Sequence, residues 1–277
     1  MRTLLLTIVS FCVLAFTASA YKLQEVNVFS ESMQKDIPTI IVMPDSYETG
    51  EAFPVVYLLH GCTDNYTRWT ERTDVELQSD IHNLIIVMPD GGYDSWYYDS
   101  PLRPDIRYET FISSELVNYV DSNYKTKKDR TARAITGLSM GGHGAMSLAL
   151  KHPDIFWQCG SMSGGVDIVP FPKSWKIKER LGVYEDNKER WKEASVQGIV
   201  EKLESTDQRI IIDCGVDDFF HKVNLTLHET LVEKKIAHDY ISRPGRHNWA
   251  FWCNSIDFQM LFFSKGFAEA AAKAEKK

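Results

Sequence analysis

Ser139 lies between glycines in the stretch Gly137-Leu138-Ser139-Met140-Gly141, and this pattern has the clearest chemical meaning in the chain. A G-x-S-x-G pattern can place a serine on a tight turn between a strand and a helix, where its hydroxyl is held out as a nucleophile. A flexible glycine-rich loop is the alternative. The apolar run before the motif and the helical pattern after it (MGGHGAMSLALKH) supply the strand–turn–helix context, so we predict that Ser139 is the nucleophile.

A serine hydroxyl needs a base to become nucleophilic, and we predict that His247 is this base. The chain has eight histidines. His247 differs from the others because it lies in the loop RPGRHNW, directly after a predicted strand, and follows all candidate acids. The order Ser, acid, His accompanies this type of serine motif. The alternative is a surface loop histidine.

The acid that orients the histidine is expected in the segment IIIDCGVDDFF. Asp213 falls within the predicted strand, which favours a structural role. Asp217 and Asp218 both follow Gly215 in the next loop, and the local pattern leaves both open. The acid would hold the imidazole tautomer and stabilise the imidazolium.

Two backbone amides are expected to bind the oxyanion of a tetrahedral intermediate. One is the N–H of Met140, directly after the serine. The other is the N–H of Cys62, in the loop after the apolar run 54–60. A competing role for Cys62 as the nucleophile is disfavoured because no activating partner is evident in the sequence.

The elements that must position these residues alternate along the chain. Continuous apolar runs, typical of strands covered on both faces, lie at 38–43, 54–60, 84–88, 133–137, 156–162, 209–214 and 238–243. Helical patterns lie at 110–123, 140–151, 219–235 and 248–267. The alternation predicts an α/β fold with a mostly parallel central sheet and helices on both faces.

The N-terminal residues predict export. Arg2, an apolar run at 4–17 and Ala18-Ser19-Ala20 match a signal peptide with its cleavage site. We therefore expect a cleaved segment at 1–20, a single domain at 21–277, and a secreted or periplasmic protein without stable membrane insertion. A charged, tryptophan-containing segment at about 165–207 interrupts the strand–helix alternation and is interpreted as an insertion beside the sheet.

Composition excludes several other functions. The net charge of −7 and the absence of a basic stripe argue against nucleic acid as a partner. No histidine–cysteine cluster has metal-ligand spacing, so we expect neither a metal nor another cofactor. Four cysteines follow the signal segment; they permit disulfides, but the sequence does not select a pairing.

The chain resembles the esterase family of α/β-hydrolases that includes esterase D, the antigen 85 mycolyltransferases, the feruloyl esterases and the tributyrin esterases. The resemblance is carried by YLLHGCTDNYTRW, VMPDGGYDSWYYDSP, GLSMGGHGAM, DCGVDDFF and GRHNWAFW. It implies an α/β-hydrolase fold and a serine carboxylesterase, and it selects Asp218 as the acid. It also implies His247 as the base and Met140 and Cys62 as the oxyanion amides, although many members carry another residue at the position of Cys62.

The substrate is expected to be an ester linked to carbohydrate. Trp96, Tyr97 and Tyr98 follow a predicted strand and would form an aromatic wall suited to a sugar or a phenolic acyl group; core packing is the alternative. Trp249, beside His247, has the same two interpretations. Export favours removal of acetyl or feruloyl groups from plant polysaccharide such as xylan. The alternatives are a thioesterase like S-formylglutathione hydrolase, an acyltransferase like antigen 85, a serine peptidase, and a fold that only binds.

Overall fold

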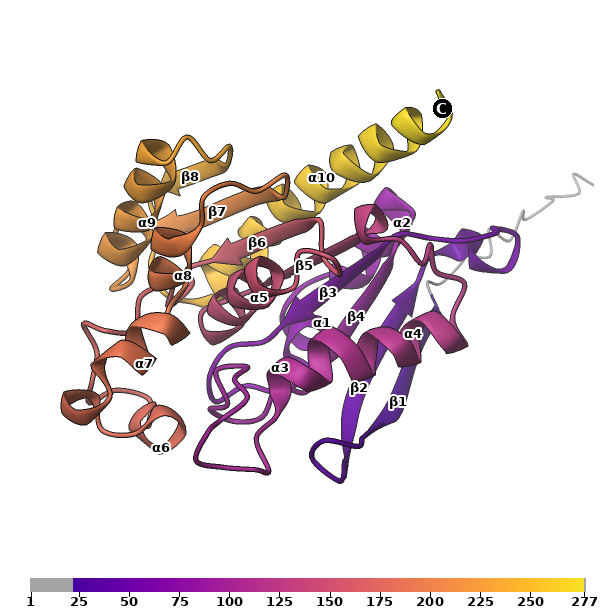
Figure 1. The fold of residues 1–277 in the computed structure, drawn as a ribbon. Coiled ribbons are helices and arrows are strands. Elements are labelled where there is room, and N and C mark those ends of the chain that lie inside the picture. Colours follow the sequence, from indigo (N-terminus) through magenta and orange to yellow (C-terminus); the bar gives the residue numbers. More distant parts are fainter. Residues whose placement is uncertain (1–21, 277) are drawn as a thin grey trace, which may run out of the picture.

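A computed structural model of the chain describes residues 22–276. Its centre is an eight-stranded sheet in the order β1-β2-β4-β3-β5-β6-β7-β8 (Figure 1). The strands are β1 (Lys22–Ser30), β2 (Lys35–Met43), β3 (Val55–Leu59), β4 (Ile85–Pro89), β5 (Arg133–Gly137), β6 (Gln158–Met162), β7 (Arg209–Gly215) and β8 (Asp239–Arg243). β1 and β2 are antiparallel to their neighbours, whereas β3 to β8 run parallel. The predicted signal segment lies outside the described residues.

The predicted α/β fold class is confirmed, and each of the seven predicted apolar runs contains or overlaps a strand. The sequence prediction missed β1, whose residues are mostly exposed. An edge strand with solvent on one side lacks the continuous apolar run that marks a strand covered on both faces.

Helices cover both faces of the sheet (Figure 1). They are α1 (Arg68–Arg72), α2 (Val75–His82), α3 (Tyr108–Thr110), α4 (Val117–Asn123), α5 (Met140–Lys151), α6 (Lys178–Leu181), α7 (Lys188–Ala194), α8 (Val196–Lys202), α9 (His221–Glu233) and α10 (Trp249–Ala274). A π-helical turn, Phe111–Leu116, joins α3 to α4. Short 3-10 helices lie at Asp45–Glu48, Arg130–Ala132 and Tyr184–Asp186.

Two apolar cores lie on the two faces of the sheet. Val55, Tyr57 and Leu59 of β3 pack in the core with α4, α5, α8 and α9. Val56 and Leu58 pack in the other core with α1, α2 and α10. Successive strand residues point to opposite faces, so β3 needs apolar side chains at every position. This explains why the central strands appear as unbroken apolar runs in the sequence.

The segment 165–207 forms α6, α7, α8 and a 3-10 turn between β6 and β7. The charged pattern from Lys188 to Lys202 is split into two helices at Ser195, whose hydroxyl caps α8 by accepting from the Gly198 N–H. α8 contacts α5 and α9, so this part of the segment belongs to a core face. α6 and α7 lie beyond the carboxyl ends of the strands in Figure 1.

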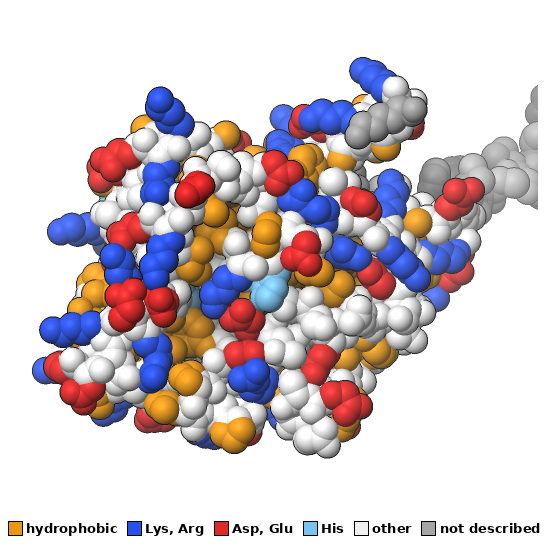
Figure 2. All heavy atoms as spheres, in the orientation of Figure 1, with side chains coloured by type: hydrophobic (Ala, Val, Ile, Leu, Met, Phe, Trp, Pro, Cys, Tyr) orange, Lys and Arg blue, Asp and Glu red, His pale blue; other side chains and the backbone are white. Residues whose placement is uncertain are grey.

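The surface is mixed in charge. Lysine and arginine side chains are interspersed with aspartate and glutamate over the face drawn in Figure 2. Among residues 22–276, no helix combines the length and apolar character that a membrane crossing requires.

Candidate active site

Ser139 occupies a sharp turn between β5 and α5. Its backbone φ of 55° and ψ of −114° are unusual for a residue with a side chain. No side chain fits at the two flanking glycines. A Cβ on Gly137 would lie 2.6 Å from the Leu59 carbonyl oxygen, and a Cβ on Gly141 would lie 2.5 Å from the same atom. The strand–turn–helix context predicted around the G-x-S-x-G motif is therefore present, with α5 beginning at Met140.

The structure brings Ser139, His247 and Asp218 together from three loops at the carboxyl edge of the sheet. His247 Nε2 lies 2.9 Å from Ser139 Oγ, and His247 Nδ1 lies 2.9 Å from Asp218 Oδ2. Because a carboxylate only accepts, the network assigns the imidazole proton to Nδ1 and leaves Nε2 free to accept the serine proton. This arrangement can activate a serine hydroxyl.

The structure also separates the three candidate acids. Asp218 has a buried carboxylate that accepts from the Phe220 N–H at 2.8 Å as well as from His247. Asp217 is exposed. Asp213 pairs with Arg243 at 3.0 Å, and burial raises the pKa of the Asp213 carboxyl. Of the three, only Asp218 contacts the histidine.

Aromatic rings surround the imidazole of His247. The Phe219 ring centroid lies 4.3 Å from it, and the Trp252 ring meets it edge-on at 4.9 Å. Phe220 contacts it from a third direction at 5.4 Å. These contacts restrict the ring to the orientation in which its two nitrogens face Ser139 and Asp218.

The two predicted oxyanion amides have no protein acceptor in the part of the chain that the structure describes. No backbone hydrogen bond is donated by either the Met140 N–H or the Cys62 N–H within residues 22–276. Met140 is the first residue of α5, where the helix dipole favours negative charge. Gly61 lies against the nucleophile, since a Cβ on it would lie 3.5 Å from Ser139 Cβ.

The thiol of Cys62 is poorly suited to be a nucleophile. Burial, with the nearby Asp94 carboxylate, raises its pKa to about 11. It is therefore protonated at neutral pH, and a thiol is a far weaker nucleophile than a thiolate. Within the described chain, Cys62, Cys159, Cys214 and Cys253 are all unpaired.

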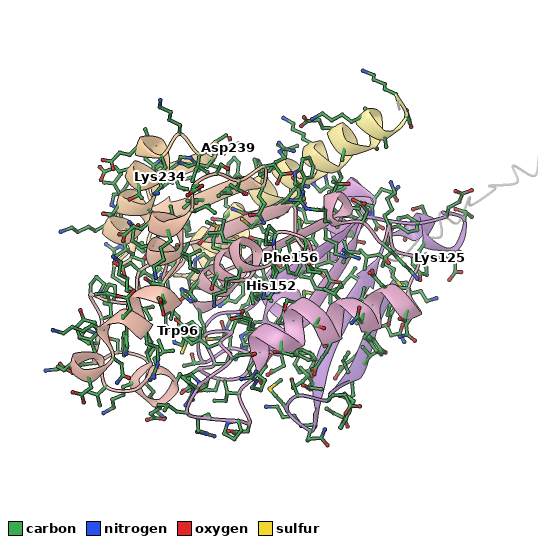
Figure 3. The ribbon with its side chains drawn as sticks, viewed as in Figure 1. Trp96, Lys125, His152, Phe156, Lys234 and Asp239 are labelled. Atoms are coloured by element: carbon green, nitrogen blue, oxygen red, sulfur yellow. The ribbon has the colours of Figure 1, made fainter. Side chains whose placement is uncertain are left out.

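The predicted aromatic wall at Trp96, Tyr97 and Tyr98 is wrong, because these side chains are only 1%, 2% and 3% exposed. Trp96 is buried, and its ring packs against His143 of α5 and Trp175 of the insertion. Figure 3 labels Trp96 on the side of the molecule where α7 lies. The Tyr97 hydroxyl donates to the His60 carbonyl at 3.1 Å. These residues support the walls of the site from behind and offer no free ring to a substrate.

Trp249, the fourth predicted substrate residue, begins α10 and is half-buried. Its ring meets Trp69 edge-on at 5.2 Å and Trp252 at 5.5 Å. Trp252 in turn contacts His247, so Trp249 lies one ring away from the catalytic group.

Two aromatic residues near His247, Phe219 and Trp175, are not predicted from the sequence. Phe219 is 54% exposed although its ring lies on His247. Trp175 comes from the insertion and stacks on Phe219 with an interplanar angle of 23°. The adjacency of Phe219 to the acid was a usable signal, but nothing in the sequence placed Trp175 beside it.

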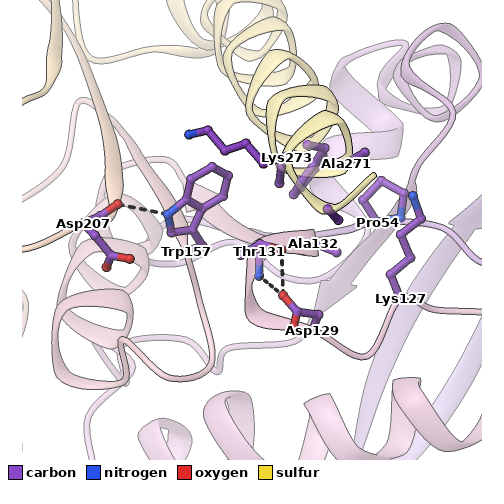
Figure 4. Close-up of a pocket in the computed structure, with 12 residues that line it drawn as sticks. Pro54, Lys127, Asp129, Thr131, Ala132, Trp157, Asp207, Ala271 and Lys273 are labelled. Carbon is purple, nitrogen blue, oxygen red and sulfur yellow. Dashed lines mark hydrogen bonds between the residues drawn. The ribbon is translucent and has the colours of Figure 1, made fainter. Parts of the chain in front are cut away.

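A cavity of about 710 Å³ lies away from Ser139, His247 and Asp218 (Figure 4). Its lining includes Pro54, Ala132, Trp157 and Asp207, which come just before β3, β5, β6 and β7. It therefore opens at the amino edge of the parallel strands, opposite Ser139. In the described chain, no group of three or more potential ligands is arranged to hold a metal ion.

Known sequences that are similar to this chain are esterases and related acyltransferases. A profile of the family described as "Putative esterase" matches residues 30–263. An esterase of Mycobacterium tuberculosis is 29% identical over 75% of this chain, and the match spans about half (51%) of that relative. An acetyl esterase of Caldicellulosiruptor saccharolyticus is 25% identical over 88% of this chain and 98% of its own length. The antigen 85B diacylglycerol acyltransferase/mycolyltransferase of Mycolicibacterium smegmatis is 28% identical over 86% of this chain and 83% of its own length.

Solved structures share the fold. A ferulic acid esterase has a TM-score of 0.75 and 27% identity, covering 90% of this chain and 99% of its own. An S-formylglutathione hydrolase of Staphylococcus aureus has a TM-score of 0.78 at 21% identity, covering 89% of this chain and all of its own, and at that identity the match speaks for the fold alone.

Proposed function

The chain belongs to this esterase family of carboxylic ester hydrolases, and on that premise we propose that it is a secreted or periplasmic enzyme that removes acetyl or feruloyl groups from plant polysaccharide. The observation that carries the catalytic part is the continuous relay from Asp218 through His247 to Ser139, with 2.9 Å at each step. Export rests on the apolar run 4–17 and the small residues at 18–20.

In the proposed mechanism, Ser139 Oγ attacks the ester carbonyl while His247 Nε2 takes the hydroxyl proton. The negative oxygen is held by the N–H groups of Met140 and Cys62. His247 then returns the proton to the departing alcohol, which leaves an acyl-serine. Water, deprotonated by the same histidine, releases the acid and restores the enzyme. Asp218 keeps the imidazole in the required tautomer throughout.

The proposed substrate class is supported by the Phe219 ring, which lies exposed on His247, and by Trp175, which stacks on Phe219. Phe219 and the half-buried Trp175 form a stacked pair that could receive a phenolic acyl group or a sugar face. They take the place of the buried residues 96–98 in this proposal. The names of the acetyl esterase and ferulic acid esterase relatives point the same way.

One test compares hydrolysis of methyl ferulate, acetylated xylan and ethyl acetate, each beside Ser139→Ala. Ethyl acetate lacks a ring, so the ratio of kcat/KM for methyl ferulate to that for ethyl acetate reports on aromatic recognition. We expect Trp175→Ala to lower this ratio about tenfold, as expected for the loss of one ring contact. Phe29→Ala removes a ring that is 48% exposed on β1 and should leave the ratio unchanged.

Turnover that survives in Ser139→Ala would contradict the catalytic proposal. An unchanged ratio in Trp175→Ala would keep the esterase and reject Trp175 as a substrate contact. Absence of turnover on ferulate and xylan, with ethyl acetate still hydrolysed, would reject the polysaccharide substrate alone.

Acyl transfer is a second candidate, because the mycolyltransferase relative aligns over 86% of this chain. It would use the same acyl-serine with a sugar hydroxyl in place of water. Product analysis with glucose added to an acetyl ester distinguishes the two: glucose acetate indicates transfer, and free acetate alone indicates hydrolysis.

A further inference from the structure

His60 directly follows β3 and is only 1% exposed, yet it takes no part in the Ser139–His247–Asp218 relay. Both nitrogens of its ring are engaged. Nε2 lies 2.7 Å from the Gly91 amide nitrogen, and Nδ1 lies 2.8 Å from the Gly61 carbonyl oxygen. Because an amide N–H only donates, Nε2 must be the acceptor, and the ring proton must be on Nδ1, donating to Gly61.

The Gly61 carbonyl belongs to the same peptide group as the Cys62 N–H. A peptide group is planar, and no cis peptide bond occurs within residues 22–276. In a trans peptide, the C=O and N–H bonds point in opposite directions. Fixing the Gly61 oxygen therefore fixes the direction of the Cys62 N–H.

Two donors hold the Gly61 oxygen on one side. They are His60 Nδ1–H and the Asp64 amide, whose nitrogen lies 3.3 Å away. The Cys62 N–H points away from that side and has no protein acceptor within residues 22–276. Gly61 itself packs against the nucleophile, since a Cβ on it would lie 3.5 Å from Ser139 Cβ. A donor on the carbonyl also polarises the peptide, which strengthens its N–H as a donor.

The surroundings of His60 keep the ring in this single state. Burial lowers the pKa of His60, although the Gly61 hydrogen bond and the Asp90 and Asp64 carboxylates act in the other direction. A proton added at Nε2 would face the Gly91 N–H and break that bond. The neutral Nδ1-protonated tautomer is the only form that satisfies both neighbours.

From this geometry we infer that His60 is a positioning residue for the oxyanion site: it orients the Gly61–Cys62 peptide so that the Cys62 N–H faces the developing oxyanion. The inference rests on the proposed function of Ser139 and goes beyond it by assigning the buried imidazole a role in transition-state stabilisation. It does not depend on which ester is the natural substrate.

The test compares His60→Leu, which removes both hydrogen bonds, with His60→Asn. The asparagine Nδ2 is as many bonds from Cα as the histidine Nδ1, so it can still donate to Gly61. With 4-nitrophenyl acetate, we expect His60→Leu to lower kcat about 10–100-fold, somewhat less than full loss of an oxyanion donor, with KM changed less than about twofold. His60→Asn should recover most of kcat.

Gln208→Leu is the matched control for lost stability. Gln208 is also buried, and its amide donates to the Ala149 and Phe156 carbonyls at 2.7 and 2.8 Å, remote from Ser139. It should lower the melting temperature and leave kcat unchanged. A boronic acid that forms a tetrahedral adduct with Ser139 should lose affinity in His60→Leu by about the same factor as kcat. Nitrogen NMR at neutral pH should find the Nδ1-protonated tautomer of His60.

Three results would overturn the inference: a kcat for His60→Leu no lower than that of Gln208→Leu, an unchanged boronic acid affinity, or an Nε2-protonated tautomer. Equal loss in His60→Asn and His60→Leu would also count against it. Failure of the proposed function has a different signature, since the wild type would then be inactive or Ser139→Ala would retain full activity.

Discussion

His247 Nδ1 and Asp218 Oδ2 lie 2.9 Å apart although 29 residues separate them in the chain. Asp217, the adjacent acid, is exposed. This contrast gives a matched pair of substitutions. Asp218→Asn should lower kcat about 10⁴-fold, because the amide no longer holds the required imidazole tautomer. Asp217→Asn should keep kcat within about twofold. Steady-state kinetics on 4-nitrophenyl acetate measures both, and the reverse order would reassign the acid.

Gly141 should not tolerate a methyl group. A Cβ there would lie 2.5 Å from the Leu59 oxygen and 2.6 Å from the His60 oxygen, and both are backbone atoms. We expect Gly141→Ala to displace the serine turn and so to lower kcat. The free energy of unfolding should also fall, by about 1–3 kcal/mol. Urea unfolding with parallel assays tests this.

Gly266→Ala on α10 is the control, because its new methyl would meet the ends of the Gln158 and Arg209 side chains. Those atoms can move more easily than backbone. A loss of stability in Gly266→Ala equal to that in Gly141→Ala would argue against the special constraint at the serine turn.

Trp96→Ala should act on stability. The ring is 1% exposed and packs against His143 and Trp175, so its removal leaves a large cavity. We expect a loss of about 3–5 kcal/mol in the free energy of unfolding, measured by chemical denaturation. A variant of normal stability with a raised KM for methyl ferulate alone would restore Trp96 as a substrate residue.

The stability of the protein should fall on acidification because of His143. Burial lowers the pKa of His143 to about 3, although its hydrogen bond to the Gly165 carbonyl acts in the other direction. The unfolded chain binds a proton at this residue below about pH 6.5, whereas the folded chain does not until about pH 3. The unfolded state is therefore favoured as the pH falls through this window.

His143→Asn keeps a donor for Gly165 and cannot take up the proton. The slope of unfolding free energy against pH between about 3 and 6.5 should decrease by ~1.4 kcal/mol per pH unit relative to the wild type. Thermal or urea unfolding at several pH values measures the slope. An unchanged slope would mean that the unfolded and folded forms titrate alike at His143.

Much of the site could be predicted because short-range steric and packing requirements limit which residue types can occur at neighbouring positions in the chain. Glycine is required beside Ser139 because the turn passes so close to the Leu59 and Gly141 backbone that a Cβ would clash. The unbroken apolar runs record strands covered on two faces, and the position of His247 after the last strand follows from the parallel order of the sheet. From residue order alone, Asp217 and Asp218 were both candidates for the acid, because adjacent residues of one turn differ only in the direction in which their side chains point. The family resemblance selected Asp218.

Tertiary structure alone decided which aromatic rings are free. Trp96, Tyr97 and Tyr98 look in sequence like a binding wall, but α5 and the insertion cover them. Phe219 looks like an ordinary core residue, but its ring remains 54% exposed on His247. The hydrogen-bond partners of His60 were likewise decided by tertiary structure, since one of them, Gly91, lies 31 residues away in the chain. Burial of a ring depends on segments that are remote in the chain and meet only on folding, so residue type and spacing predict the nucleophile and its order of partners but not the surface that meets the substrate.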